Sequence, residues 1–212
     1  MGAHAWDESD VPPLEAGDRL DQAEFHRRYL ASPQIKKAEL VEGVVYVASP
    51  VKNGHSEQHG HIMTVLGLYA AATPGARIAD NGTVILGGDS EVQPDALLRR
   101  EHGTCVETPD GYLKGPPELV FEVASSSTAY DLNQKRTVYR VAGVREYAVL
   151  VVRERRVRWF DLVDGDHIER DPPEDGVFRS VVFPGFWLDS NALLRGDLAA
   201  LIVTARSGLD AG

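Results

Sequence analysis

The sequence predicts an α/β domain with a mixed central sheet flanked by helices and an antiparallel β meander added at its C-terminal end. The stretch "ELVFEVASSS", residues 118–127, is apolar at nearly every early position, which is typical of a strand covered on both faces. A helical pattern follows over 129–143, and a second apolar run covers 145–154. This strand–helix–strand centre is the pattern of an α/β domain.

The elements before this centre are bounded by breaker and turn residues. Pro33 and Pro74-Gly75 end helical patterns, and Glu42-Gly43 is a turn candidate between two apolar runs. In chain order the sequence predicts a helix over 18–32, a pair of strands over 38–50, a helix over 55–75, short strands over 83–88 and 92–98, and a loop over 100–117.

The elements after the centre are separated by acidic turns. Gly143 is a good stop for the helix at 129–143. The turns "DGD" and "DPPEDG" divide strand-like runs that resemble an antiparallel meander. These runs lie at 156–163, 166–171 and 177–188, and a last helix is expected over 197–208.

Composition limits the classes of protein to which the chain can belong. Its 212 residues suffice for one domain, which we place at 19–212, with residues 1–18 expected to be a disordered tail. No apolar run approaches the roughly 20 residues that cross a bilayer, and the acidic N-terminus lacks an apolar signal core. The single cysteine, Cys105, excludes an internal disulfide and favours a cytoplasmic location. A net charge of −10 argues against a broad nucleic-acid-binding face, but not against a local one.

Three polar residues in the centre are not required by local structure. Asp95 follows Pro94 in "VQPDALL", Glu122 interrupts the apolar strand, and Lys135 lies on the next helix. A carboxylate buried in such a strand costs several kcal/mol unless it is paired. Lys135 shares a helix face with Leu132 and Tyr139, so that face would aim its ammonium group at or beside Glu122.

Two carboxylates on neighbouring strands with a lysine nearby have a plain chemical use. Oxygen ligands hold Mg²⁺ or Mn²⁺, which keeps several waters and accepts phosphate oxygens. A lysine beside an attacking water can orient it, assist its deprotonation or stabilise developing negative charge. The sequence therefore predicts a site of Mg²⁺ or Mn²⁺ at Asp95 and Glu122, with Lys135 beside it.

Five segments in order carry a family resemblance. They are "ELVEGVVYVASP", "VQPD", "PPELVFEVASSST", "DLNQK" and "YRVAGVREYAVL". In this order and spacing they resemble the Uma family of putative restriction endonucleases, within the PD-(D/E)xK nuclease superfamily. The resemblance covers about residues 20 to 185 and implies a restriction-endonuclease-like fold.

The resemblance also implies roles for individual residues. Asp95 matches the motif aspartate, Glu122 matches the motif acidic residue, and the backbone carbonyl of Val123 matches a further metal ligand. The motif lysine is absent at Ala124, and the family's helix lysine matches Lys135. Glu39 matches a family glutamate that supports the metal from further away.

The chain also departs from the family pattern in two places. The usual "SPST" reads Ser125-Ser126-Ser127-Thr128, and "EYWLVDP" reads "EYAVLVV". The first change removes a proline, and the second removes a tryptophan and an aspartate. None of these is a motif residue.

Each site residue also has an ordinary structural interpretation. Asp95 could be a turn residue after proline, and Glu122 could face solvent on an open sheet. Lys135 could pair with Asp131 at i, i+4, which is worth only about 0.3–0.5 kcal/mol. The metal site is favoured because it explains all three residues and their order.

Other residue groups predict chemistry less well. "HSEQH" is similar to a zinc-protease helix, but Glu57 is at the wrong position, so His55 and His59 are expected to be solvated or capping rather than metal ligands, and His61 to lie on another face. Cys105 near His102 is expected to be inert. "SSSTAYD" predicts a helix cap, with a phosphate cradle as the alternative.

These observations predict a metal-dependent phosphodiester hydrolase that acts as a DNA endonuclease. The alternative is an inactive nuclease-fold module that binds nucleic acid or a partner protein, which the acidic net charge favours. Cleavage of both strands of a duplex would call for two active sites, so a homodimer is also expected. No membrane partner is expected.

Overall fold

The computed structural model describes residues 11–48, 53–125 and 127–212. The strands in these ranges form two six-stranded sheets and a two-stranded sheet, in the orders β12-β11-β10-β9-β6-β3, β2-β1-β5-β4-β8-β7 and β13-β14. The mixed α/β architecture with a small C-terminal antiparallel sheet confirms the predicted fold class. No helix in the described ranges is both long and apolar enough to cross a membrane.

The large sheet is built around β9 (Leu119–Ala124) and β10 (Glu146–Val151), in which every residue is buried. They pair in parallel, as a strand–helix–strand unit requires. The connection consists of α3 (Thr128–Tyr130), a π-helical segment η2 (Asp131–Lys135) and α4 (Arg136–Ala142). Gly143 ends α4 with φ 94°, a left-handed conformation that glycine adopts without strain, as predicted.

The remaining strands of the large sheet are antiparallel to their neighbours. β6 (Ala96–Arg100) pairs with β9, and β3 (Ala76–Asp80) pairs with β6. On the other side, β11 (Arg156–Val163) and β12 (Asp166–Glu169) continue from β10 as the predicted meander. The last predicted strand is instead a separate hairpin, β13 (Val177–Arg179) and β14 (Trp187–Asp189).

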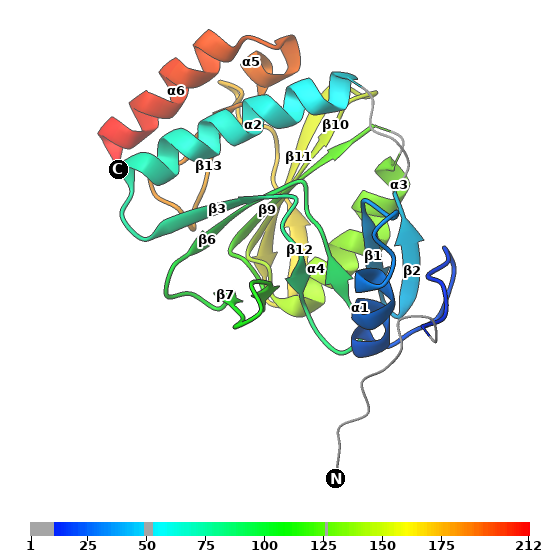
Figure 1. Ribbon diagram of the computed structural model, residues 1–212. Helices are drawn as coiled ribbons and strands as arrows, with labels where there is room; N and C mark the ends of the chain where they lie inside the picture. Colours follow the sequence, from blue (N-terminus) through cyan, green and yellow to red (C-terminus); the bar gives the residue numbers. More distant parts are fainter. Residues whose placement is uncertain (1–10, 49–52, 126) are drawn as a thin grey trace.

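Helices cover one face of the large sheet. Figure 1 shows α2 (Asn53–Ala72) and α6 (Leu198–Ala211) lying side by side above it, close to α5 (Ser190–Arg195). Phe121, Trp159 and Phe186 pack beneath them in the largest apolar cluster. Burial of these aromatic side chains stabilises this face.

The second sheet and α4 lie on the opposite face. Tyr139, Tyr147 and Phe160 form the core there together with Val84 and Val92 of the second sheet. The strands of that sheet are β1 (Ala38–Val41), β2 (Val44–Val47), β4 (Val84–Ile85), β5 (Glu91–Val92), β7 (Val106–Glu107) and β8 (Leu113–Lys114). Glu42 and Gly43, with φ 49° and 76°, form the predicted tight turn between β1 and β2.

The N-terminal helix α1 (Gln22–Leu30) covers β1 and β2 through the fully buried Phe25. Residues 1–10 of the predicted tail lie outside the described residues. In the described remainder, Leu14 is buried beside Phe25, and the Gly17 amide donates to the Val45 carbonyl. This part of the chain therefore packs against the second sheet.

Candidate functional site

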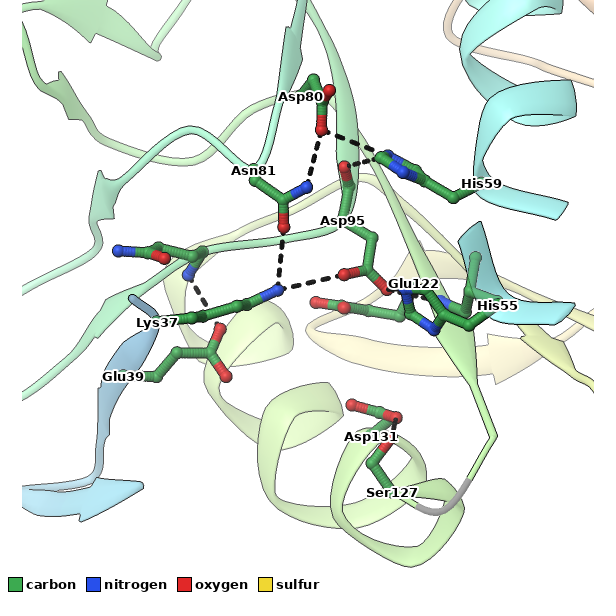
Figure 2. A network of polar contacts seen from close by, with 12 residues as sticks. Lys37, Glu39, His55, His59, Asp80, Asn81, Asp95, Glu122, Ser127 and Asp131 are labelled. Atoms are coloured by element: carbon green, nitrogen blue, oxygen red, sulfur yellow. Dashed lines mark hydrogen bonds and ion pairs between the residues drawn. The ribbon is translucent and has the colours of Figure 1, made fainter. Parts of the chain in front are cut away.

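Asp95 and Glu122 lie opposite each other on neighbouring strands. The antiparallel register pairs Ala96 with Phe121 and Leu97 with Val120, so the residue before β6 faces Glu122. Residues that face each other in an antiparallel pair point to the same side of the sheet. Figure 2 shows the two carboxylates side by side. The two carboxylates therefore lie on the same face of the sheet.

Pro94 explains why this pairing stops where it does. The same register would place Pro94 opposite Val123, and proline has no N–H to donate to the Val123 carbonyl. The Val123 amide donates instead to Asp95 Oδ2 at 2.8 Å. The Pro-Asp pair thus fixes the aspartate on β9 and withholds a donor from the Val123 carbonyl.

Asp95 is buried between two basic side chains. Lys37 Nζ lies 3.0 Å from Asp95 Oδ1, and His55 Nε2 lies 3.6 Å from Oδ2. Burial raises the pKa of Asp95, but Lys37, Lys135 and the Val123 amide outweigh burial, so the pKa is lower than usual. Asp95 is therefore an ionised buried carboxylate and not an exposed turn residue.

Glu122 is 2% exposed, which excludes the solvent-facing interpretation. It forms an ion pair with Lys135, and the Tyr139 hydroxyl donates to its Oε1 at 2.8 Å. Burial raises the pKa of Glu122 to about 8, against the lowering effect of the Lys135 ammonium. The glutamate is held rigidly in the core strand, facing the start of β6.

Lys135 ends the π-helical segment and is almost completely buried. It contacts Glu122 and lies 2.9 Å from Glu39 Oε1. Burial lowers the pKa of Lys135, but the neighbouring carboxylates outweigh burial and raise it well above its usual value. A π-helical turn of this kind is frequent at functional sites because it re-aims a side chain.

The alternative pairing of Lys135 with Asp131 is wrong. The Asp131 carboxylate accepts instead from the Ser127 hydroxyl at 2.5 Å, at the start of α3. Ser127 therefore does not cap the helix through its side chain, contrary to the predicted cap. The widened helical turn moves Lys135 toward the sheet, while Asp131 stays with Ser127.

Glu39 joins the second sheet to this group. Its Oε1 accepts from the Gln93 amide at 2.8 Å and from Lys135, and the Tyr130 hydroxyl lies 3.4 Å from Oε2. The resemblance implied a supporting position for Glu39. The structure places it in contact with the lysine beside Glu122.

Lys37 was missed by the sequence reasoning. It precedes β1, and its ammonium group contacts both Asp95 and the Asn81 side chain at 3.0 Å. The available signal was its spacing of two from Glu39, since alternate residues of a strand share a face. Two lysines and three carboxylates therefore gather where the two sheets meet.

The histidines of α2 lie closer to the site than expected. His59 Nε2 lies 2.7 Å from the Asp95 carbonyl and 3.3 Å from Asp80 Oδ1, and His55 faces the Asp95 side chain. Both are mostly buried and are neither solvated nor capping. Figure 2 shows them approaching Asp95 from the side opposite Lys37.

The residues fit a hard divalent cation through oxygen atoms. Among the described residues, no group of three or more histidine, cysteine, aspartate or glutamate side chains is arranged to hold a metal. Asp95 and Glu122 converge, however, and Val123 adds a carbonyl that β6 cannot satisfy. Two carboxylates and a carbonyl, completed by water, suit Mg²⁺, which usually keeps several waters.

A cavity of about 340 Å³ lies elsewhere. It is lined by Tyr69, Arg100 and Phe183 among others, at the opposite end of β6 from Asp95. Its lining is mostly apolar, and none of the carboxylates above contributes to it. Asp95 and the carboxylates around it therefore lie at the opposite end of β6 from this cavity.

We expect Cys105 to resist thiol reagents in the folded protein. The side chain is fully buried, and burial raises the pKa of its thiol from 9.0 to about 11. At about pH 8 a disulfide reagent should label the native chain slowly and the denatured chain completely. Because ionisation between these pKa values favours the unfolded chain, stability should fall as the pH rises through this window. Rapid native labelling would contradict the burial.

The chain is similar to a known protein family in sequence and to a solved structure in fold. A family model described as "Putative restriction endonuclease", Uma2, matches residues 22–191. The search of curated proteins found no match. Among solved structures, the chain is similar to a putative nuclease belonging to DUF820 from Anabaena variabilis, with a TM-score of 0.63 and 14% identity over 75% of this chain and 90% of that one. At this identity the likeness concerns the fold alone.

Proposed function

Because the chain belongs to the Uma2 family of putative restriction endonucleases, we propose that Asp95, Glu122 and Lys135 form the active site of a metal-dependent DNA endonuclease. The observation that supports this proposal is the convergence of two buried carboxylates from paired strands upon a buried lysine. Burial of three ionisable groups carries a large desolvation cost. Apolar residues would serve a purely structural role without that cost.

The proposed metal ligands are Asp95, Glu122 and the carbonyl of Val123. A bound Mg²⁺ or Mn²⁺ would supply positive charge that attracts phosphate oxygens and makes a water easier to deprotonate. The Val123 amide fixes one oxygen of Asp95, so its other oxygen, which Lys37 now contacts, would face the cation. Tyr139 orients Glu122 in the same way.

Lys135 acts through its charge in this proposal. The surrounding carboxylates hold its pKa well above the usual value, so the ammonium group keeps its proton. It is therefore unsuited to take a proton from water. We assign it to orienting the attacking water and stabilising the negative charge that develops on the phosphoryl oxygens. Glu39 fixes the ammonium group in place for this role.

The rival function is an inactive module that keeps the fold for binding. The net charge of −10 favours it, because phosphate binding needs clustered cations. The complete set of Asp95, Glu122 and Lys135 favours the enzyme, because a binding module has no need of them.

The proposal extends to location and assembly. A reducing cytoplasm suits the single buried cysteine, and cleavage of both strands of a duplex suits a homodimer.

Asp95→Asn is the variant that tests the proposed function. The wild-type protein should cleave DNA with Mg²⁺ or Mn²⁺ and be inactive in a chelator, and single-stranded, duplex and branched DNA should be compared. The substituted amide side chain retains an acceptor for the Val123 amide but loses the charge, so we expect cleavage to fall roughly 10²–10³-fold.

Asp80→Asn is the matched control for this variant, because Asp80 is exposed and lies just outside the proposed ligand set. Its cleavage rate should stay close to that of the wild type. A wild-type protein that binds metal but cleaves none of these DNA substrates would contradict the proposed activity.

A further inference from the structure

An arginine-rich turn lies between β10 and β11. Four of the six residues at 153–158 are arginine in a chain whose net charge is −10. We call Arg153, Arg155, Arg156 and Arg158 the arginine hairpin. The first three side chains are exposed, and Arg158 is partly buried. A local concentration of guanidinium groups on an acidic protein calls for an explanation other than general solubility.

The arginine hairpin lies at the same end of the large sheet as Glu122. In the parallel pair, Val149 lies beside Glu122 and Val151 beside Ala124, and the Val152 amide donates to the Ala124 carbonyl at 3.0 Å. The turn therefore begins at the level where β9 ends. In Figure 1, β10 and β11 are the yellow strands that continue the sheet from β9.

Two of the arginines lie on the face of the sheet to which Glu122 points. Arg158 pairs with Val149, which pairs in turn with Glu122, so the three residues form one row across the sheet. Arg156 lies opposite Val151, one step further toward the same end. With strands about 4.8 Å apart, the backbone of Arg158 lies roughly 10 Å from that of Glu122. This spacing is within the reach of one nucleic-acid strand.

Contacts within the protein hold the guanidinium groups in position but do not neutralise all of their charge. Arg158 and Arg156 both contact Glu169, at 3.0 and 2.9 Å, and Arg158 also lies 5.2 Å from the centre of the Phe160 ring. Arg155 donates to the Leu194 carbonyl. The hairpin also contains the exposed Glu154. Its four arginines therefore face two carboxylates, Glu154 and Glu169, which leaves net positive charge at this surface.

We propose that the arginine hairpin binds the phosphodiester backbone of duplex DNA and holds the duplex across the candidate active site. Arginine suits this role because its planar group binds phosphate through two hydrogen bonds. Contacts to phosphate position the duplex and carry no base sequence. This inference rests on the proposed function for the choice of DNA, and its test is binding without cleavage.

The first test removes two charges from the hairpin. Arg153→Gln combined with Arg156→Gln should weaken binding of a short labelled duplex roughly tenfold, and should lower the slope of log affinity against log salt by about 2. Fluorescence anisotropy in a chelator at several salt concentrations measures both values and excludes cleavage.

The matched control for this variant is Arg77→Gln combined with Arg179→Gln. The side chains of Arg77 and Arg179 are 49% and 44% exposed, against 48% for Arg156, and each also pairs with a carboxylate. In the strand register, Arg77 of β3 lies opposite Arg99 of β6, near the end of β6 that is distant from Asp95. This control should leave both the affinity and the salt slope nearly unchanged.

The second test predicts a gain in affinity. Glu169→Gln frees Arg156 and Arg158 from their shared partner and removes a negative charge beside them, so duplex binding should tighten about two- to fivefold. Glu101→Gln is the control, because Glu101 pairs with Arg77 in the same way outside the hairpin. A gain of this sign cannot arise from misfolding.

The outcomes separate this inference from the proposed function. The inference would be overturned if both double variants weakened binding equally or if Glu169→Gln had no effect. It would also be overturned if the protein preferred RNA or if the wild type failed to bind DNA. Cleavage with normal binding by the hairpin variants would overturn the inference alone. Specific loss of binding, in a protein that never cleaves, would support the hairpin and refute the proposed activity.

Discussion

Glu122→Gln is expected to abolish metal binding and to reduce DNA cleavage by at least about 10²-fold. The substitution keeps the size of the side chain and an oxygen that can still accept from Tyr139. It removes only the charge that would hold a divalent cation. Calorimetric titration with Mn²⁺ measures the loss of metal affinity directly. It does not depend on finding the correct DNA substrate.

The same variant should fold normally without metal. Lys135 keeps its contact with Glu39, and the raised pKa of Glu122 shows that burial disfavours its ionised form. The free energy of unfolding should therefore change by less than about 1 kcal/mol, or increase. A large fall in melting temperature would instead make Glu122 a structural residue.

Glu118→Gln is the matched control for Glu122→Gln. Glu118 is also buried and lies just before the same strand, but it accepts from the Arg100 amide at the opposite end. Metal affinity and cleavage should be unaffected by this change, whatever its cost in stability. Equal loss of metal binding in the two variants would place the metal elsewhere.

The strand β9 and its Glu122 could be predicted because a buried strand has a recognisable sequence pattern. A strand covered on both faces must be apolar at consecutive positions, so Glu122 stands out in β9. Asp95 was identifiable beside proline, and Gly143 by the conformation it adopts. In each case one local physical requirement selects the residue type.

The contacts of Lys37, His55 and Glu39 could not be predicted because they join separate elements. Lys37 and Glu39 reach the site only through the packing of the second sheet on the first, which is absent from any local pattern. His55 could be placed on a helix but not over Asp95. The π-helical turn before Arg136 was also missed, since a regular helix was assumed from the spacing of three and four.

The weakly periodic strands were missed for a different reason. β3, with the sequence "ARIAD", is short and only partly buried, and β7 and β8 consist of two residues each within the predicted loop at 100–117. Such short strands owe their existence to pairing with a neighbour and not to a hydrophobic pattern. The short helix α5 similarly depends on its Asp189 cap, which accepts from the Ala192 amide.

Lys135→Met is expected to have the largest combined effect on activity and stability. Methionine fills a similar volume without charge, so the loss of the positioned ammonium group should reduce cleavage roughly 10²–10⁴-fold. Without metal, Glu39 and Glu122 would lose their shared cation while buried. The cost of leaving such groups unpaired is about 3–5 kcal/mol, which thermal unfolding in a chelator would reveal.

Divalent metal should then partly rescue the stability of Lys135→Met but not its activity. A cation bound at Asp95 and Glu122 replaces part of the missing charge, so Mn²⁺ should raise the melting temperature of this variant more than that of the wild type. Lys37→Met is the comparison, because Lys37 is 24% exposed and contacts Asp95 but not Glu122, so its loss should cost less stability. If Lys135→Met cleaves DNA as fast as the wild type, the ammonium group only neutralises buried carboxylates, and its catalytic role must be abandoned.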